Sequence, residues 1–247
     1  MLPPDVNGLI ALGLIALSLL TSLITATFSL GGGSLMIAAM ALVLPPVVVV
    51  PVHACVQFGS NAGRAWVLRA HIQWHFILWL TLGALLGSVL GGRLAFLLPE
   101  KWFAAAIGVF VLVTTWLPQP PGVANNRAVQ FFGGAIVSAV GMVVGAAGPL
   151  LAAFVRSIPD RRQLVATHAM LNSLQHVIKV AVFAALGFAF RDYVPLILAM
   201  VAAGFVGTRI GSRLLTRVPE HVFRLSFRVL LSVVAIGLIL RVGTGGQ

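Results

Sequence analysis

Acidic side chains are the scarcest charged groups in this sequence. Asp and Glu together number five in 247 residues, against 16 Lys and Arg. All five lie in a terminus or in a polar segment between apolar runs: Asp5, Glu100, Asp160, Asp192 and Glu220. The apolar runs therefore hold no carboxylate. This argues against a carboxylate relay for protons or sodium, against a divalent-cation site, and against an intramembrane protease that uses Asp or Glu.

Cysteine is almost missing as well, since Cys55 is the single one. One thiol cannot form an intrachain disulfide, and it cannot build a metal site from several thiolates. We interpret Cys55 as a small residue in helix packing.

Polar surface is the third shortage. The chain is 60% hydrophobic and 9% charged, which leaves too little polar surface for a soluble globule. Long apolar runs without a period-2 alternation favour helices over a β-barrel. We predict an all-α polytopic membrane protein with about 8–10 membrane segments, including broken or re-entrant helices.

The net charge of +11 comes from basic residues that stand singly between apolar runs. An excess of Lys and Arg in cytoplasmic loops explains most of them, so we expect the lipid bilayer and no nucleic acid as a partner. Their distribution favours an orientation with both termini outside the cell.

The proline-rich linker 118–127 divides the chain into a first membrane repeat, 1–117, and a second, 128–247. Five apolar segments precede it, at 8–30, 33–50, 53–69, 75–98 and 102–117. Five follow, at 128–147, 149–157, 163–190, 194–217 and 221–241. Segment 149–157 would rise only about 14 Å as a helix, against a hydrocarbon core of about 30 Å. We therefore predict that it is half of a broken hairpin.

Two copies of one pattern, a glycine-rich break followed by a polar stripe, are offset by 115 residues. The offset places Gly33 on Gly148, His53 on His168, Gln57 on Asn172, Asn61 on His176 and Arg64 on Lys179. Spacings of 4, 8 and 11 residues fall within about 80° of the first residue on a helix. Each copy therefore carries one narrow polar face, and an odd number of segments per repeat predicts that the second copy is inverted.

Every polar group of these faces is a hydrogen-bond donor or can carry positive charge, which indicates a site for an anion. Helices starting after Gly33 and Gly148 would add backbone N–H groups and the positive end of a dipole. The predicted substrate-binding residues are Gly32, Gly33, Ser34, His53, Gln57, Asn61, Arg64, Gly148, His168, Asn172, His176 and Lys179.

Each of these residues also has a purely structural interpretation. A central lysine such as Lys179 costs about 3 kcal/mol to insert, unless it reaches an interface. Buried histidines often only tie helices together, and the amides of Gln57 and Asn172 can bond between helices. The register of the stripe with the glycine break in both copies favours the anion site.

The segment Phe28–Leu35, its echo at 145–151 and the loop Leu68–Trp74 together resemble the TauE/SafE family of sulfite and organosulfonate exporters, also called TSUP. The loop has Ala70 and Gln73 where the family often has Gly and Asp. The resemblance covers nearly the whole chain. It implies a multi-pass permease of the bacterial inner membrane that moves sulfur-containing anions, usually outward.

We therefore expect a transporter for a small anion, sulfite or an organosulfonate, that works by alternating access between inverted repeats. A channel-like permease is a close variant. The alternative is a permease for a transition metal or another inorganic ion, motivated by His53, Cys55, His168 and His176. We expect no enzyme, because no nucleophile, base and orienting acid can be assembled from the apolar segments. No cofactor is expected, and a homodimer is left open.

Overall fold

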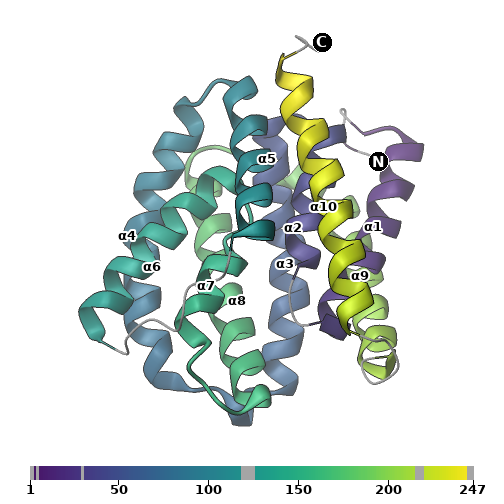
Figure 1. Cartoon of the computed structure of the whole chain (residues 1–247). Coiled ribbons are helices and arrows are strands. Elements are labelled where there is room, and N and C mark those ends of the chain that lie inside the picture. Colours follow the sequence, from purple (N-terminus) through teal and green to yellow (C-terminus); the bar gives the residue numbers. More distant parts are fainter. Residues whose placement is uncertain (1–2, 4–5, 29–30, 118–125, 215–219, 244–247) are drawn as a thin grey trace.

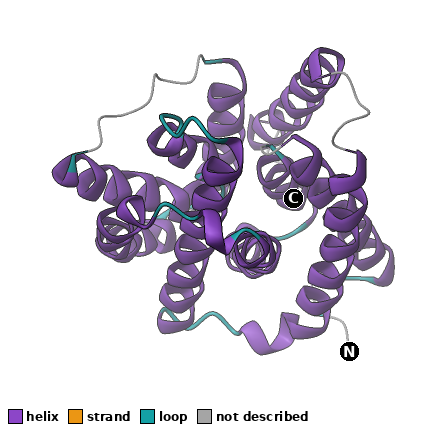
Figure 2. Ribbon diagram, turned by 90° about the horizontal axis from the view of Figure 1, so that it is seen from below, coloured by secondary structure: helices purple, strands orange, loops and turns teal. Residues whose placement is uncertain are grey.

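The computed structural model describes residues 3, 6–28, 31–117, 126–214 and 220–243. Within these ranges the chain is helical and contains no strand, so the prediction of an all-α polytopic membrane fold is confirmed (Figures 1 and 2). Asp5, Ser29, Leu30 and the part of the linker at 118–125 lie outside the described residues.

Ten α-helices follow one another along the described chain, five before the linker and five after it. The first five are α1 (Gly8–Phe28), α2 (Gly32–Val43), α3 (Pro46–Val67), α4 (Trp74–Leu97) and α5 (Glu100–Trp116). The second five are α6 (Arg127–Val144), α7 (Gly148–Val155), α8 (Arg161–Ala185), α9 (Val194–Leu214) and α10 (Glu220–Gly243). Two short 3-10 helices, η1 (Arg69–His71) and η2 (Phe190–Tyr193), precede α4 and α9.

By length and composition, four helical stretches of the described chain can cross a membrane. They are Gly8–Thr27, Trp74–Ala95, Arg127–Val144 and Phe190–Gly211. Helices α3 and α8, with 22 and 25 residues, are also long enough to cross a membrane at the rise of an α-helix. They differ from the four stretches above because they carry the polar stripes.

The boundary between the second and third apolar segments was predicted wrongly. The sequence placed it between residues 50 and 53, whereas α2 ends at Val43 and α3 begins at Pro46. Proline disfavours the helical conformation in the residue before it and lacks an N–H, so Pro45 and Pro46 end α2. Pro46 then stands in the first turn of α3, where the missing N–H costs little. Helix α3 gains length as a result and carries Pro51 inside it.

Both glycine-rich breaks are present. Helices α2 and α7, with 12 and 8 residues, rise only about 18 and 12 Å, which is less than the hydrocarbon core of about 30 Å. Gly31 before α2 has φ 99°, and Gly145 after α6 has φ 77°, a conformation that other residues rarely adopt. A Cβ atom would also overlap the Phe227 ring at Gly31 and Ile37 at Gly145. Both breaks therefore require glycine.

Helix packing pairs elements from opposite halves of the chain. Helices α3 and α8 are in contact at the centre, while α4 packs on α6 and α1 packs on α9 (Figure 1). Glycines allow close contact in two of these helix pairs. Gly87 and Gly91 of α4 lie directly on the backbone of α6 at Ala135 and Ala139. In the same way Gly207 and Gly211 of α9 lie on the backbone of α1 at Leu19 and Leu23.

Helix α1 begins and α10 ends at the same end of the molecule (Figure 1). Helix α4, the fourth helix of the first half, contacts α6, the first helix of the second half. Helix α9, the fourth helix of the second half, contacts α1, the first helix of the first half, as expected for two related repeats. The inversion of the halves across the membrane stays a prediction.

Candidate functional site

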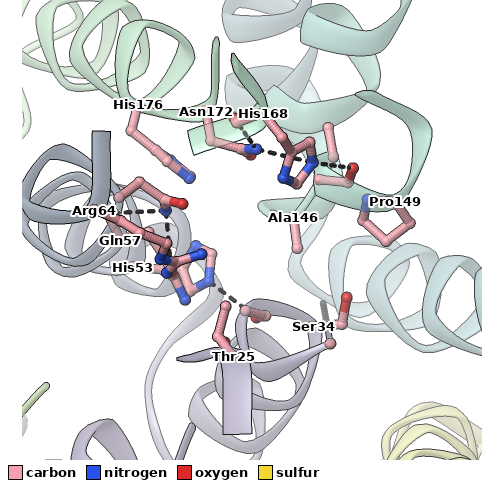
Figure 3. Close-up of a pocket in the computed structure, with 15 residues that line it drawn as sticks. Thr25, Ser34, His53, Gln57, Arg64, Ala146, Pro149, His168, Asn172 and His176 are labelled. Atoms are coloured by element: carbon pink, nitrogen blue, oxygen red, sulfur yellow. Dashed lines mark hydrogen bonds between the residues drawn. The ribbon is translucent and has the colours of Figure 1, made fainter. Parts of the chain in front are cut away.

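One cavity of about 50 Å³ lies where the two polar stripes meet the two breaks. Helix α3 contributes His53, Gln57, Asn61 and Arg64, and α8 contributes His168, Asn172 and His176. The breaks contribute Gly31, Gly33 and Ser34 on one side and Ala146, Ala147, Gly148 and Pro149 on the other, and α1 contributes Thr25. Figure 3 shows the side chains of α3 and α8 facing each other across an open centre.

The cavity is lined by ten of the twelve residues predicted from the sequence, all except Gly32 and Lys179. Gly32 packs against α1, where a Cβ atom would overlap the backbone oxygen of Thr21. Lys179 is 2% exposed, and its Nζ donates to the carbonyl oxygens of Gly141 and Gly145 at 2.8 and 2.7 Å. The structure thus brings the stripes together at one place, and the binding of an anion there stays a prediction.

Two histidines make the same contact in the two halves. Nε2 of His53 donates to the Gly33 carbonyl at 3.1 Å, and Nε2 of His168 donates to the Gly148 carbonyl at 3.0 Å. A carbonyl only accepts, so Nε2 carries the hydrogen and Nδ1 of a neutral ring has a free lone pair. Each histidine therefore fastens a break to the long helix that faces it.

The side-chain amides of Gln57 and Asn172 also lie in equivalent places in the two halves. A Cβ atom on Gly33 would lie 3.1 Å from Nε2 of Gln57, and one on Gly148 would lie 3.5 Å from Oδ1 of Asn172. Nδ2 of Asn172 donates to the His168 carbonyl at 2.9 Å. It also lies 3.1 Å from Nε2 of His168, which is itself a donor, so we assign the hydrogen bond to the carbonyl. The pairs His53 and His168, and Gln57 and Asn172, therefore lie beside their glycine breaks in equivalent ways.

Among the residues that the structure describes, no acidic side chain lines the cavity. Arg64 is the lining residue with a permanent positive charge, and its Nη2 donates to Oγ of Ser60 at 3.4 Å. Three buried nitrogen atoms of lining side chains have no hydrogen-bond partner: Nε of Arg64 and Nδ1 of His53 and His176. Buried polar groups are normally satisfied, so these atoms are available to a polar ligand or to water in the cavity.

Within the described residues, no group of three or more His, Cys, Asp and Glu side chains could hold a metal ion. Cys55, on α3, is half-buried and does not line the cavity.

Sequence reasoning missed Thr25 as a lining residue. Its Oγ1 donates to the Thr21 carbonyl at 2.8 Å, within its own helix. Several Ser and Thr residues occur in the first apolar segment, and only the approach of α1 to α2 decides which one reaches the cavity. Ala146, Ala147 and Pro149 line it because the second break does. They were part of the predicted break but had not been named as site residues.

Two helix breaks, matching polar stripes on α3 and α8 and a polar cavity between them are features found in membrane transporters. The family model described as sulfite exporter TauE/SafE matches residues 14–238. The chain therefore belongs to this family, and the protein is a membrane transporter of the sulfite and anion type. No match was found among curated proteins or among solved structures.

Proposed function

We propose that the protein exports a small sulfur oxyanion, with sulfite as the first candidate, by alternating access of the cavity to the two sides of the membrane. The observation that carries the proposal is the unpartnered Nε of Arg64, in a cavity that no carboxylate lines. An oxyanion offers acceptor oxygens to this N–H and a negative charge to the guanidinium group.

The size of the cavity supports a compact ion. A water molecule needs roughly 10–15 Å³ of such space, so about 50 Å³ holds on the order of four water-sized groups. A central atom with three or four oxygens matches this size. An organosulfonate adds a carbon body and fits the cavity less well. We therefore place sulfite before organosulfonates.

Two features support alternating access. The lining comes from both halves, with α3 facing α8, so a movement of one half relative to the other changes the cavity. Broken helices beside the site expose backbone groups that are tolerated in a membrane only when they are buried in protein or face a polar cavity. The outward direction rests on membership of the exporter family.

The test uses the purified full-length protein. Binding of sulfite, sulfate, thiosulfate, methanesulfonate and taurine is measured by calorimetry, and transport by counterflow in proteoliposomes. We expect saturable binding of sulfite, weaker binding of taurine, and exchange of internal for external sulfite. Flux that does not saturate and shows no counterflow would indicate a channel. Transport of Zn²⁺ or Ni²⁺ without any anion binding would contradict the proposal.

A further inference from the structure

Lys179 stands in the C-terminal third of α8, one turn beyond His176, yet its side chain leaves the polar stripe. The ammonium group is buried and forms two short hydrogen bonds with α6, to the carbonyl oxygens of Gly141 and Gly145. Gly141 lies in the last turn of α6, and Gly145 directly follows the helix. Lys179 therefore fastens α8 to the end of α6 at the point where the second break starts.

The end of α6 carries a partial negative charge. The aligned peptide dipoles place their negative end at the last carbonyl groups of a helix. The Gly141 carbonyl already accepts the Gly145 N–H at 3.0 Å, so Lys179 is a second donor to it. A cation that donates to the carbonyl oxygens of Gly141 and Gly145 offsets the charge of this helix end. The next residues, Ala146 and Ala147, line the cavity. Without the lysine, an uncompensated negative helix end would lie beside an anion site.

Arg64 occupies the position equivalent to Lys179 in the other repeat, and its surroundings differ. Arg64 lines the cavity, and its Nε has no partner, whereas Lys179 does not line the cavity and has two backbone partners. Arg64 and Lys179, although equivalent in the two repeats, therefore make different contacts.

We propose that Lys179 is a positioning residue, which holds the break between α6 and α7 against the cavity and offsets the charge of the α6 end, while Arg64 contacts the anion. The part that concerns the anion rests on the proposed function. The part that concerns the break does not, so the two can be tested separately.

The first measurement needs no substrate. In a Cys55→Ser background, which removes the native thiol, a single cysteine is introduced as Ala146→Cys in the second break. A matched control carries Ser34→Cys in the first break. Both positions line the cavity, and Ser34 is 5% and Ala146 6% exposed. The rate of alkylation by a small maleimide is measured with Lys179 intact and in Lys179→Met.

We expect Lys179→Met to increase alkylation of Ala146→Cys by about tenfold, as expected for losing a buried cation at a helix C-terminus, and to leave Ser34→Cys unchanged.

In the same Cys55→Ser background without either added cysteine, Lys179→Met should weaken sulfite binding by about tenfold and leave maximal turnover nearly unchanged. Lys179→Arg should restore both values, because guanidinium N–H groups can also donate to the two carbonyl oxygens. Global unfolding would expose both cysteines and would not be reversed by this conservative change.

Unchanged alkylation of Ala146→Cys in Lys179→Met overturns the proposal. If sulfite binding is lost at the same time, Lys179 contacts the anion directly. If Lys179→Met does not accumulate in the membrane, Lys179→Gln retains one amide donor group and should give an intermediate alkylation rate. A rate equal to that of the lysine form then overturns the proposal. A wild-type protein that binds no sulfite contradicts the proposed function but leaves the alkylation contrast valid.

Discussion

His53 of α3 and His176 of α8 meet edge to face in the cavity, with ring centroids 5.9 Å apart and planes inclined by 72°. The two residues belong to different halves of the chain, and Nδ1 of each ring is buried without a partner. This contact joins α3 to α8 at the cavity, so it changes whenever the two helices move relative to each other. Four predictions test this arrangement.

The first concerns Arg64, the lining residue with permanent charge. Arg64→Gln should weaken sulfite binding by about 10- to 150-fold, because a hydrogen bond to a charged group is worth about 1.5–3 kcal/mol. Arg64→Lys should bind with intermediate affinity, since it keeps the charge and loses the fork of donors. Calorimetry on the purified variants measures the effect.

The control is Arg69→Gln. Arg69 is exposed in η1 and lies over the Trp66 ring, with its guanidinium carbon 4.9 Å from the ring centre. It does not line the cavity. Equal losses of affinity in Arg64→Gln and Arg69→Gln would show that general surface charge, rather than the cavity, attracts the anion.

The second prediction is that anion binding strengthens as the pH falls. Gly33 and Gly148 hold Nε2 of His53 and His168, so an added proton must go to Nδ1. The proton converts a lone pair into an N–H donor and adds positive charge. A ligand that prefers the protonated form binds more tightly at lower pH, by up to about tenfold per pH unit for one coupled proton. Affinity should therefore fall as the pH rises from the titration range of the free site to that of the occupied site.

Methanesulfonate is the probe for this experiment, because its charge does not change between mildly acidic and mildly alkaline pH. The double variant His53→Gln, His168→Gln should keep some binding and lose most of the pH dependence, with His176 as the remaining titratable ring in the cavity. A pH profile equal to that of the wild type would exclude this proton route.

The helical fold and the narrow polar face of each copy could be predicted from the sequence, because both depend on local rules. Long apolar runs without a period-2 alternation favour helices in a membrane, and residues spaced by 4, 8 and 11 share a helical face whatever surrounds it. The glycine breaks could be located for a similar reason, since Gly31 and Gly145 take backbone conformations that favour glycine.

The contacts of a long side chain depend on helix packing, which the sequence pattern alone could not predict. The stripe placed Lys179 on the face of His176, but its four-carbon stem reaches α6, a helix whose approach no local pattern reveals. The α2–α3 boundary was missed because the apolar run continues through Pro45 and Pro46, and proline rather than polarity ends the helix there.

The third prediction concerns Gly32, which the sequence proposed as a binding residue and the structure places against α1. Gly32→Ala should destabilise the protein by about 1–3 kcal/mol, because the new methyl group would overlap the Thr21 carbonyl oxygen and Oγ1 of Thr25. Gly63→Ala on α3 is the control, since a Cβ there meets nothing within 4 Å. Thermal unfolding in detergent compares the two. Equal stability of both variants would contradict the packing of α2 on α1.

The fourth prediction concerns orientation in the membrane. Helix α8 has 25 residues and rises about 38 Å, so the loops at its two ends should lie on opposite sides of a hydrocarbon core of about 30 Å. The basic residues Arg156, Arg161 and Arg162 at its start predict that this end lies in the cytoplasm. In a Cys55→Ser background, Ser157→Cys and Arg191→Cys each provide one exposed thiol, before and after α8.

A membrane-impermeant maleimide added to intact cells should therefore label Arg191→Cys and spare Ser157→Cys until the cells are permeabilised. Labelling of Ser157→Cys alone would invert the whole molecule and with it the direction in which each face of the cavity opens. Labelling of both thiols in intact cells would mean that the chain inserts in two orientations, because the rise of α8 separates the two positions by more than the hydrocarbon core. The distribution of arginine would then be too weak to set a single orientation, despite the basic cluster at the start of α8.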